Sequence, residues 1–174
     1  MGDAGVAVIL ERAPKGQGIP VAGFTTLSDH SRLCLGFASA VGPGAAMFTK
    51  ARTIHKVAID DSPPLLKQVL DASGLSFGDI DYVIPHQTSA RAIEKGTREI
   101  SERLGVFPKN VVVIVDEFGN TASTTHFVAL YKYLTEGRFK KGDNIMLISF
   151  ASGLEVGVII FTMDKLVEHY GRKD

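Results

Sequence analysis

The sequence predicts a layered α/β domain in which a mixed sheet carries helices on both of its faces. Two observations lead to this fold class. Short segments rich in β-branched residues alternate with segments of helical periodicity, and the last two strand-like segments are separated by only three residues, as in a hairpin. A single domain accounts for all 174 residues, which is enough chain to bury a core.

The N-terminal third contributes two of the expected strands. Residues 6–10 and 20–27 have strand composition, and we interpret a chain that begins directly in a strand as a truncation or a split point. Residues 28–51 are rich in Gly, Ser and Ala but carry several large apolar side chains. We therefore expect a long, functional excursion at 28–51 rather than a linker.

The middle of the chain predicts two helices and one strand. Residues 52–72 have a helical pattern that we expect to be interrupted or redirected at Pro63-Pro64, because proline can open a new helix but breaks an existing one. A short buried strand is expected at 80–84. The clearest helix is 89–104, in which four side chains of one face recur at helical spacing: Ile93, Thr97, Ile100 and Leu104.

The C-terminal third predicts three strands and two helices. Residues 111–115 are a continuous β-branched run, which is typical of a central strand covered on both faces. A helix is expected at 121–136, followed by strands at 144–150 and 154–162 that pair as a hairpin. A short helix at 164–170 completes the pattern.

Composition excludes several functional classes. Nineteen basic residues balance nineteen acidic ones, so no global charge draws the protein to nucleic acid or to an anionic membrane. No apolar run approaches the ~18 residues of a membrane span. The single cysteine, Cys34, excludes an internal disulfide and fits a reducing cytoplasm, and with five scattered histidines it argues against a metal site. An apolar content of 45% favours a further face buried against a partner in an oligomer, or else a strand-rich core.

Two polar residues at strand ends are the candidate catalytic groups. His86 and Asn120 each follow an expected strand and precede an expected helix, which places both at one edge of the sheet. An imidazole N–H and an amide N–H are suited to stabilising a carbonyl oxygen that becomes negative. The structural alternatives are a helix N-cap for Asn120 and a hydrogen-bonded core or loop histidine for His86.

The two motifs together resemble a known family. Residues 81–87 (DYVIPHQ) and 119–123 (GNTAS) resemble the signatures of β-ketoacyl-acyl-carrier-protein synthase III and its condensing-enzyme relatives of the thiolase superfamily. The opening segment 2–10, the turn at 137–143 and the hairpin at 150–153 are similar to further parts of the same family. The resemblance extends over nearly the whole chain.

The resemblance implies a thiolase-type half-domain with a mixed five-stranded sheet, in which residues 1–174 are the second of two similar halves. In that family a cysteine of the first half takes the acyl group. The histidine and asparagine of the second half assist decarboxylation of a malonyl thioester and stabilise the resulting enolate. By position, these two catalytic roles fall on His86 and Asn120.

The resemblance also implies binding roles for the terminal hairpin. The backbone N–H of Ser152 matches the place where the family helps to hold the acyl-enzyme oxyanion. Phe150 matches an aromatic residue beside the active site, and we place it with Gly153 in the substrate pocket. No metal or cofactor is implied; coenzyme A and phosphopantetheine thioesters enter only as substrates.

A basic stripe is the candidate docking surface. Arg91 matches a family residue implicated in carrier-protein docking, and Lys95 and Arg98 recur with it on the helix face opposite Ile93. An acidic carrier protein or a coenzyme phosphate could bind this stripe. The alternative is a solvated face whose charges pair locally, for example Glu94 with Arg98 four residues later.

Cys34 is not the expected nucleophile. It lies between two leucines in the 28–51 excursion, without a helix N-terminus or an adjacent base to lower its pKa, and it does not match the family cysteine. The sequence therefore predicts part of an acyltransferase of fatty-acid or polyketide biosynthesis. Its partners would be a cysteine-bearing N-terminal half, acyl carrier protein and acyl-CoA, and the isolated chain would be inactive. The alternative is a non-catalytic module that binds acyl carriers or stabilises a partner synthase.

Overall fold

The computed structural model describes residues 2–14 and 18–170, and its centre is a mixed sheet. In the described residues this sheet has four strands in the order β1-β6-β5-β4. Their bounds are Val21–Thr26 for β1, Tyr82–Pro85 for β4, Asn144–Ala151 for β5 and Glu155–Thr162 for β6. The β1–β6 and β6–β5 pairs are antiparallel, whereas β5 and β4 are parallel. The predicted mixed sheet and terminal hairpin are thus confirmed.

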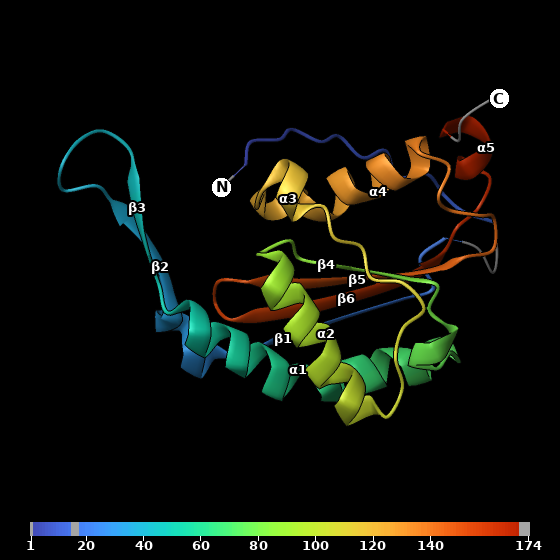
Figure 1. Ribbon diagram of the computed structural model, residues 1–174, viewed down its shortest axis with the longest axis horizontal. Coiled ribbons are helices and arrows are strands. Elements are labelled where there is room, and N and C mark those ends of the chain that lie inside the picture. The colour runs from blue at the N-terminus through green and yellow to red at the C-terminus, as the bar shows by residue number, and fades with distance from the viewer. Residues whose placement is uncertain (1, 15–17, 171–174) are drawn as a thin grey trace.

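Helices cover both faces of this sheet, as predicted (Figure 1). One face carries two long helices, α1 (Ala51–Ser73) and α2 (Ala90–Leu104). The other face carries α4 (Thr125–Thr135), flanked by the short helices α3 (Val115–Phe118) and α5 (Leu166–Tyr170). Each face has its own apolar cluster, because strand residues alternate between the two sides.

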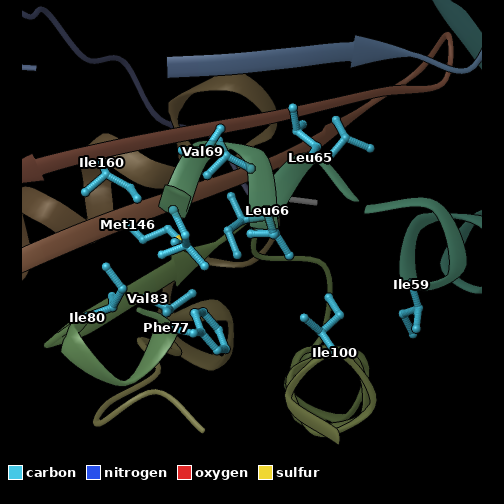
Figure 2. Close-up of a cluster of buried hydrophobic side chains, with 14 residues drawn as sticks. Ile59, Leu65, Leu66, Val69, Phe77, Ile80, Val83, Ile100, Met146 and Ile160 are labelled. Carbon is cyan, nitrogen blue, oxygen red and sulfur yellow. The ribbon is translucent and has the colours of Figure 1, made fainter. Parts of the chain in front are cut away.

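The cluster beneath α1 and α2 is the larger of the two (Figure 2). Leu66 and Val69 of α1 meet Met146 of β5 and Ile160 of β6 here, and Ile100 is the contribution from α2. The second cluster joins the α4 face to strands β4 and β5; among its members are Ile84, Ala129, Ile145 and Leu147.

Two predicted strands are wrong. Residues 6–10 form no strand; they run outside the sheet, with Ile9 88% exposed. Residues 111–115 join the sheet only through one parallel bridge between Val111 and Val83, with the Val112 N–H donating to Val83 O at 2.8 Å. The other four of the six predicted strands form the sheet in the described residues, one fewer than the five strands that the resemblance implies.

The 28–51 excursion has structure of its own. A 3-10 helix (Ser28–Leu33) leads into an antiparallel hairpin of β2 (Cys34–Ala38) and β3 (Ala45–Thr49). This hairpin is a separate two-stranded sheet that projects from the body of the domain (Figure 1). Its apolar side chains are largely exposed, among them Phe37 and Met47.

Helix α1 passes through Pro63 and Pro64 without the expected interruption. Each proline lacks the N–H that would bind the carbonyl four residues earlier, here those of Ile59 and Asp60. Arg103 of α2 replaces both donors: its Nη1 donates to Ile59 O at 3.1 Å and to Asp60 O at 3.3 Å. The same guanidinium pairs with the Asp60 carboxylate. A side chain from the neighbouring helix thus satisfies the carbonyls that the prolines leave open.

Candidate active site

His86 lies directly after β4, where its backbone is fixed to the neighbouring strand. The His86 N–H donates to Ile148 O of β5 at 2.8 Å, continuing the parallel β4–β5 pairing by one residue. Position 86 is therefore set by the sheet and not by a loop. The imidazole lines a cavity on the α1–α2 side.

Gln87, the next residue, is the reason that residues 111–115 do not form a strand. Its side chain is 0% exposed, and its Nε2 donates to Pro85 O and Val112 O, both at 2.9 Å. Its Oε1 accepts from the Ile114 N–H at 2.7 Å. The backbone of this segment therefore pairs with a side chain where a strand would pair with a neighbour. Gln87 belongs to the 81–87 motif, but the sequence alone assigns it no role.

The cavity beside His86 has a volume of about 340 Å³ and runs along α2 from Ser89 towards Ile100. Ser89 caps this helix, its Oγ accepting from the Ala92 N–H at 3.2 Å, and Gly105 ends it in a left-handed conformation. The wall is mainly apolar and is shared by α1, α2 and the sheet; it includes Ile54, Ala58, Ile59, Ile93, Ile148 and Phe150. Such a channel suits a slender, mostly apolar ligand.

His86 is neutral at pH 7. Burial, with a further contribution from His126, lowers the pKa of His86 to about 4. The ring centroids of the two histidines are 6.1 Å apart. A neutral imidazole carries one N–H donor and one acceptor nitrogen, so His86 can donate a hydrogen bond without being charged.

Asn120 lies in a turn between α3 and α4, one residue before Thr121, which is the N-cap of the 3-10 helix Ala122–Thr124 that leads into α4. Its Oδ1 accepts from the Ala122 N–H at 2.9 Å, which orients the side chain; Asn120 is not among the residues that line the cavity beside His86. Ala122 has a φ of +53°, a backbone conformation that an alanine rarely adopts. Such strain is characteristic of functional turns.

The terminal hairpin places its three predicted residues at or near the end of β5. Phe150 lines the cavity with His86. Ser152 and Gly153 lie in the turn between β5 and β6, and Gly153 has a φ of +144° that favours glycine. Leu27 holds this turn through two backbone bonds with Leu154, of 2.7 and 3.3 Å.

The basic stripe is present on the exposed surface of α2. Arg91, Lys95 and Arg98 line a shallow depression together with Glu94. Lys95 pairs with Glu99 at 3.5 Å, an exposed i,i+4 pair that stabilises the helix by only tenths of a kcal/mol. The remaining positive charges are available to an acidic partner.

Cys34 and the other histidines take different positions. Cys34 begins β2 in the projecting hairpin, its Sγ 3.4 Å from Oγ1 of Thr49, a residue that lines the cavity beside His86. His55 lines the cavity, and burial followed by the charge of Lys95 lowers the pKa of its imidazole. Within residues 2–14 and 18–170 no three His, Cys, Asp or Glu side chains are grouped to hold a metal ion.

His126 lies near His86 but was not among the candidate site residues. On sequence grounds it is a helix residue with a structural or surface role. In the structure it is buried in the first turn of α4, and its Nε2 lies 2.9 Å from Ile148 O. Only the folded chain reveals that this carbonyl also binds the His86 backbone.

The described part of the chain contains no helix that is both long enough and apolar enough to cross a membrane. This finding agrees with the absence of long apolar runs in the sequence.

Comparison with known proteins identifies the family. Residues 70–163, more than half of the chain, match the family described as 3-oxoacyl-[acyl-carrier-protein (ACP)] synthase III, C terminal. The chain is 35% identical to β-ketoacyl-[acyl-carrier-protein] synthase III of Symbiobacterium thermophilum over 173 residues, covering 91% of this chain and 50% of the relative. The corresponding protein of Deinococcus deserti is 33% identical over 159 residues, covering 88% and 44%. The chain thus spans about half the length of the curated relatives it matches.

Solved structures agree with this assignment. The 3-oxoacyl-[acyl-carrier-protein] synthase III of Aquifex aeolicus superposes with a TM-score of 0.72 at 25% identity, covering 87% of this chain and 46% of that one. The synthase III of Pseudomonas aeruginosa gives 0.73 at 22% identity, with coverages of 88% and 48%, and supports the fold. The chain therefore belongs to the 3-oxoacyl-[acyl-carrier-protein] synthase III family, in which it corresponds to the C-terminal, thiolase-like half-domain.

Proposed function

We propose that this chain provides the decarboxylation and enolate-stabilising half of a condensing enzyme that joins an acyl thioester to a malonyl thioester. The observation that carries the proposal is a neutral, sheet-anchored His86 at the wall of an apolar cavity of about 340 Å³. Asn120, oriented by the Ala122 amide, is the second donor. A cysteine-bearing N-terminal half would hold the acyl group.

In this reaction His86 and Asn120 donate hydrogen bonds to the thioester oxygen of the malonyl group. The bond between the malonyl carboxylate and its α-carbon breaks, carbon dioxide leaves, and the electron pair moves onto the thioester as an enolate. The α-carbon then attacks the acyl thioester on the partner cysteine, forming a carbon–carbon bond and releasing the thiolate. Both donors act on the oxygen on which negative charge develops.

The burial of His86 serves this role. A protonated imidazole would bind the malonyl carboxylate in the ground state and oppose its loss. A pKa lowered to about 4 keeps the ring neutral at pH 7, so that the imidazole stabilises the forming enolate oxygen more than the carboxylate. The Ser152 N–H is proposed to bind the oxyanion of the acyl-enzyme, and Phe150 and Gly153 to border the reacting groups.

The cavity and the basic stripe fit the carrier of the malonyl group. A phosphopantetheine arm is long, thin and ends in a thioester, which suits a channel along α2 that reaches His86. Arg91, Lys95 and Arg98 on the outer face of the same helix suit the phosphates of coenzyme A or the acidic surface of a carrier protein. Malonyl-CoA and the malonyl-carrier protein both have such an arm and a negatively charged part.

An uncovered part of the sheet supports the need for a second half. Gly23 faces α1, since a Cβ at this position would meet Val69 and Leu65. Its neighbour Phe24 therefore points to the opposite face, where it lies over Gly157 and is 72% exposed. An apolar side chain on a sheet face that α4 leaves open is suited to packing against a partner.

The experiment is a decarboxylation assay on the chain assembled with the cysteine-bearing N-terminal half of the Symbiobacterium relative. With malonyl-CoA and malonyl-carrier protein as substrates, His86→Ala and Asn120→Ala should each lower the rate about 10²- to 10³-fold, the loss expected for one oxyanion donor. The exposed His169→Ala and Asn110→Ala variants are matched controls and should remain active. Full activity in both site variants would contradict catalysis and favour a module that only binds acyl carriers.

A further inference from the structure

One backbone carbonyl connects both histidines of the site. Ile148 O of β5 accepts the backbone N–H of His86 at 2.8 Å and lies 2.9 Å from His126 Nε2. A carbonyl oxygen has two lone pairs and can accept both donors at once. The β4 strand end and the first turn of α4 are therefore tied to the same atom.

This contact defines the tautomer of His126. A carbonyl can only accept, so Nε2 must carry the hydrogen and donate it. Burial lowers the pKa of His126, against the opposing effect of its bond to Ile148, so the ring remains neutral. The side chain is 7% exposed, and its ring plane is tilted by 34° from that of His86.

The same residue is also connected to the Asn120 turn. Only five residues separate Asn120 from His126, and buried threonines hold the turn against the helix start. Thr121 Oγ1 lies 3.2 Å from Thr125 Oγ1, and Thr124 Oγ1 donates to Thr121 O at 2.8 Å. Moving the first turn of α4 would therefore move Asn120 relative to the sheet.

Packing alone does not require a histidine at position 126. Ile148 O is already satisfied by the His86 N–H, so a second donor is not needed to avoid an unpaired carbonyl. Burying an imidazole costs free energy that a phenylalanine of similar volume would not. Stability therefore does not account for the hydrogen bond from His126. Its effect is to link the first turn of α4 to the strand end that carries His86.

We propose that His126 is a positioning residue, which through the Ile148 carbonyl fixes the Asn120 turn relative to the His86 imidazole. The inference rests on the proposed function of these two donors, and His126 itself does not touch the substrate. The charged groups further along α4 are directed elsewhere: Lys132 pairs with Glu117 and Glu136. On the α1–α2 side, Lys95 and Glu99 act on the pKa of His55.

Two substitutions separate the hydrogen bond from the volume of the ring. His126→Phe keeps the bulk and removes the donor, whereas His126→Gln keeps an N–H that can reach the place of Nε2. In the assembled enzyme, His126→Phe should lower kcat for malonyl-CoA decarboxylation about 10- to 100-fold, as expected when a reacting group is misplaced. KM should remain within about 2-fold, and His126→Gln should recover most of the rate. An unchanged kcat in His126→Phe, or an equal loss in both variants, would overturn the inference.

A second readout does not depend on catalysis. In the full chain, the ring resonances of His86 are followed by NMR as pH falls, with wild type and both variants compared. His126→Phe should shift these resonances and raise the pKa of His86, because the neighbouring imidazole no longer lowers it. His126→Gln should also raise this pKa but leave the resonance positions at pH 7 closer to wild type. Identical His86 spectra in wild type and His126→Phe would overturn the inference, whereas an active His86→Ala enzyme would contradict the proposed function itself.

Discussion

The two faces of the sheet differ in how completely they are covered. On one face the 23-residue helix α1 and its neighbour α2 bury a continuous cluster and enclose the cavity beside His86. On the other face the 11-residue helix α4 covers β4 and β5 but leaves Phe24 of β1 exposed. The first face forms a core by itself, whereas the second is suited to being completed by another folded unit.

The site lies between these two regions. His86 is anchored to the sheet and opens onto the covered side, while Asn120 belongs to a turn that leads into α4 on the open side. The groups that would perform the reaction therefore depend on both faces. The contrast predicts that changes on the covered face act on stability, and that changes on the open face act on association.

The largest effect is expected from paired substitutions on the two faces. Leu66→Ala removes a fully buried side chain beneath α1 and should lower the free energy of unfolding by about 2–5 kcal/mol. Phe24→Ala should change the stability of the isolated chain by less than about 0.5 kcal/mol, since that side chain is mostly exposed. Denaturant melts measure both values. A Phe24 variant as unstable as the Leu66 variant would show that the open face is already a core.

The next effect is a dependence of stability on pH. The pKa of His86 is lowered to about 4 in the folded state, against 6.5 in the unfolded chain, and that of His126 is lowered as well. As pH falls, the unfolded state therefore takes up protons before the folded state does. The free energy of unfolding should be at its full value above about pH 6.5 and should fall as pH decreases towards 4. Melting curves of wild type and His86→Leu check this prediction, with His169→Leu as the control for loss of an exposed histidine. An equal slope in wild type and His86→Leu would argue against a buried neutral His86.

A smaller effect is expected at the α1–α2 contact. Arg103→Ala removes the donor to the carbonyls that Pro63 and Pro64 leave open, and should cost about 1–2 kcal/mol. In a background with both prolines changed to alanine, the helix can bind these carbonyls itself. The cost of Arg103→Ala should therefore decrease in a double-mutant cycle. If the loss of stability from Arg103→Ala is the same with and without the prolines, Arg103 does not replace their missing donors.

Pro63 and Pro64 show which features of the fold local sequence patterns can predict and which they cannot. The helix at 89–104 was predicted correctly because its signals are local: a serine cap, a helical stripe and a terminal glycine. The interruption of α1 was wrong because the compensating guanidinium of Arg103 comes from a different helix, about 40 residues away. Local rules detect the missing N–H groups but not their replacement.

The same distinction applies to the strands and to the site. The β-branched run at 111–115 predicted a strand, yet the buried Gln87 side chain occupies the hydrogen bonds that a strand would make. The motifs made His86 and Asn120 candidates, since both stand in recognisable local sequences, and their catalytic roles stay a prediction. His126 could not be found in this way, because its importance depends on a carbonyl of a strand far along the chain.

The smallest effect on stability is expected from the basic stripe. Lys95→Ala breaks only an exposed pair with Glu99 and should change the free energy of unfolding by a few tenths of a kcal/mol. In the assembled enzyme, replacing Arg91, Lys95 and Arg98 together should raise KM for the malonyl-carrier protein and weaken its dependence on salt. Steady-state kinetics at two ionic strengths measure this change, with Lys67→Ala on α1 as an exposed control. An unchanged KM would exclude the stripe as the docking surface.

We propose that a cysteine-bearing half binds to the open face and that the enzyme is complete only then. The most direct test measures the condensation of acetyl-CoA with malonyl-carrier protein by this chain alone, by the N-terminal half of the Symbiobacterium relative alone, and by the two assembled. We predict product only from the assembled pair, with the acyl group on the cysteine of the N-terminal half. Product from this chain alone, with an acyl group on Cys34, would contradict the account, as would a stable assembled pair that forms no product.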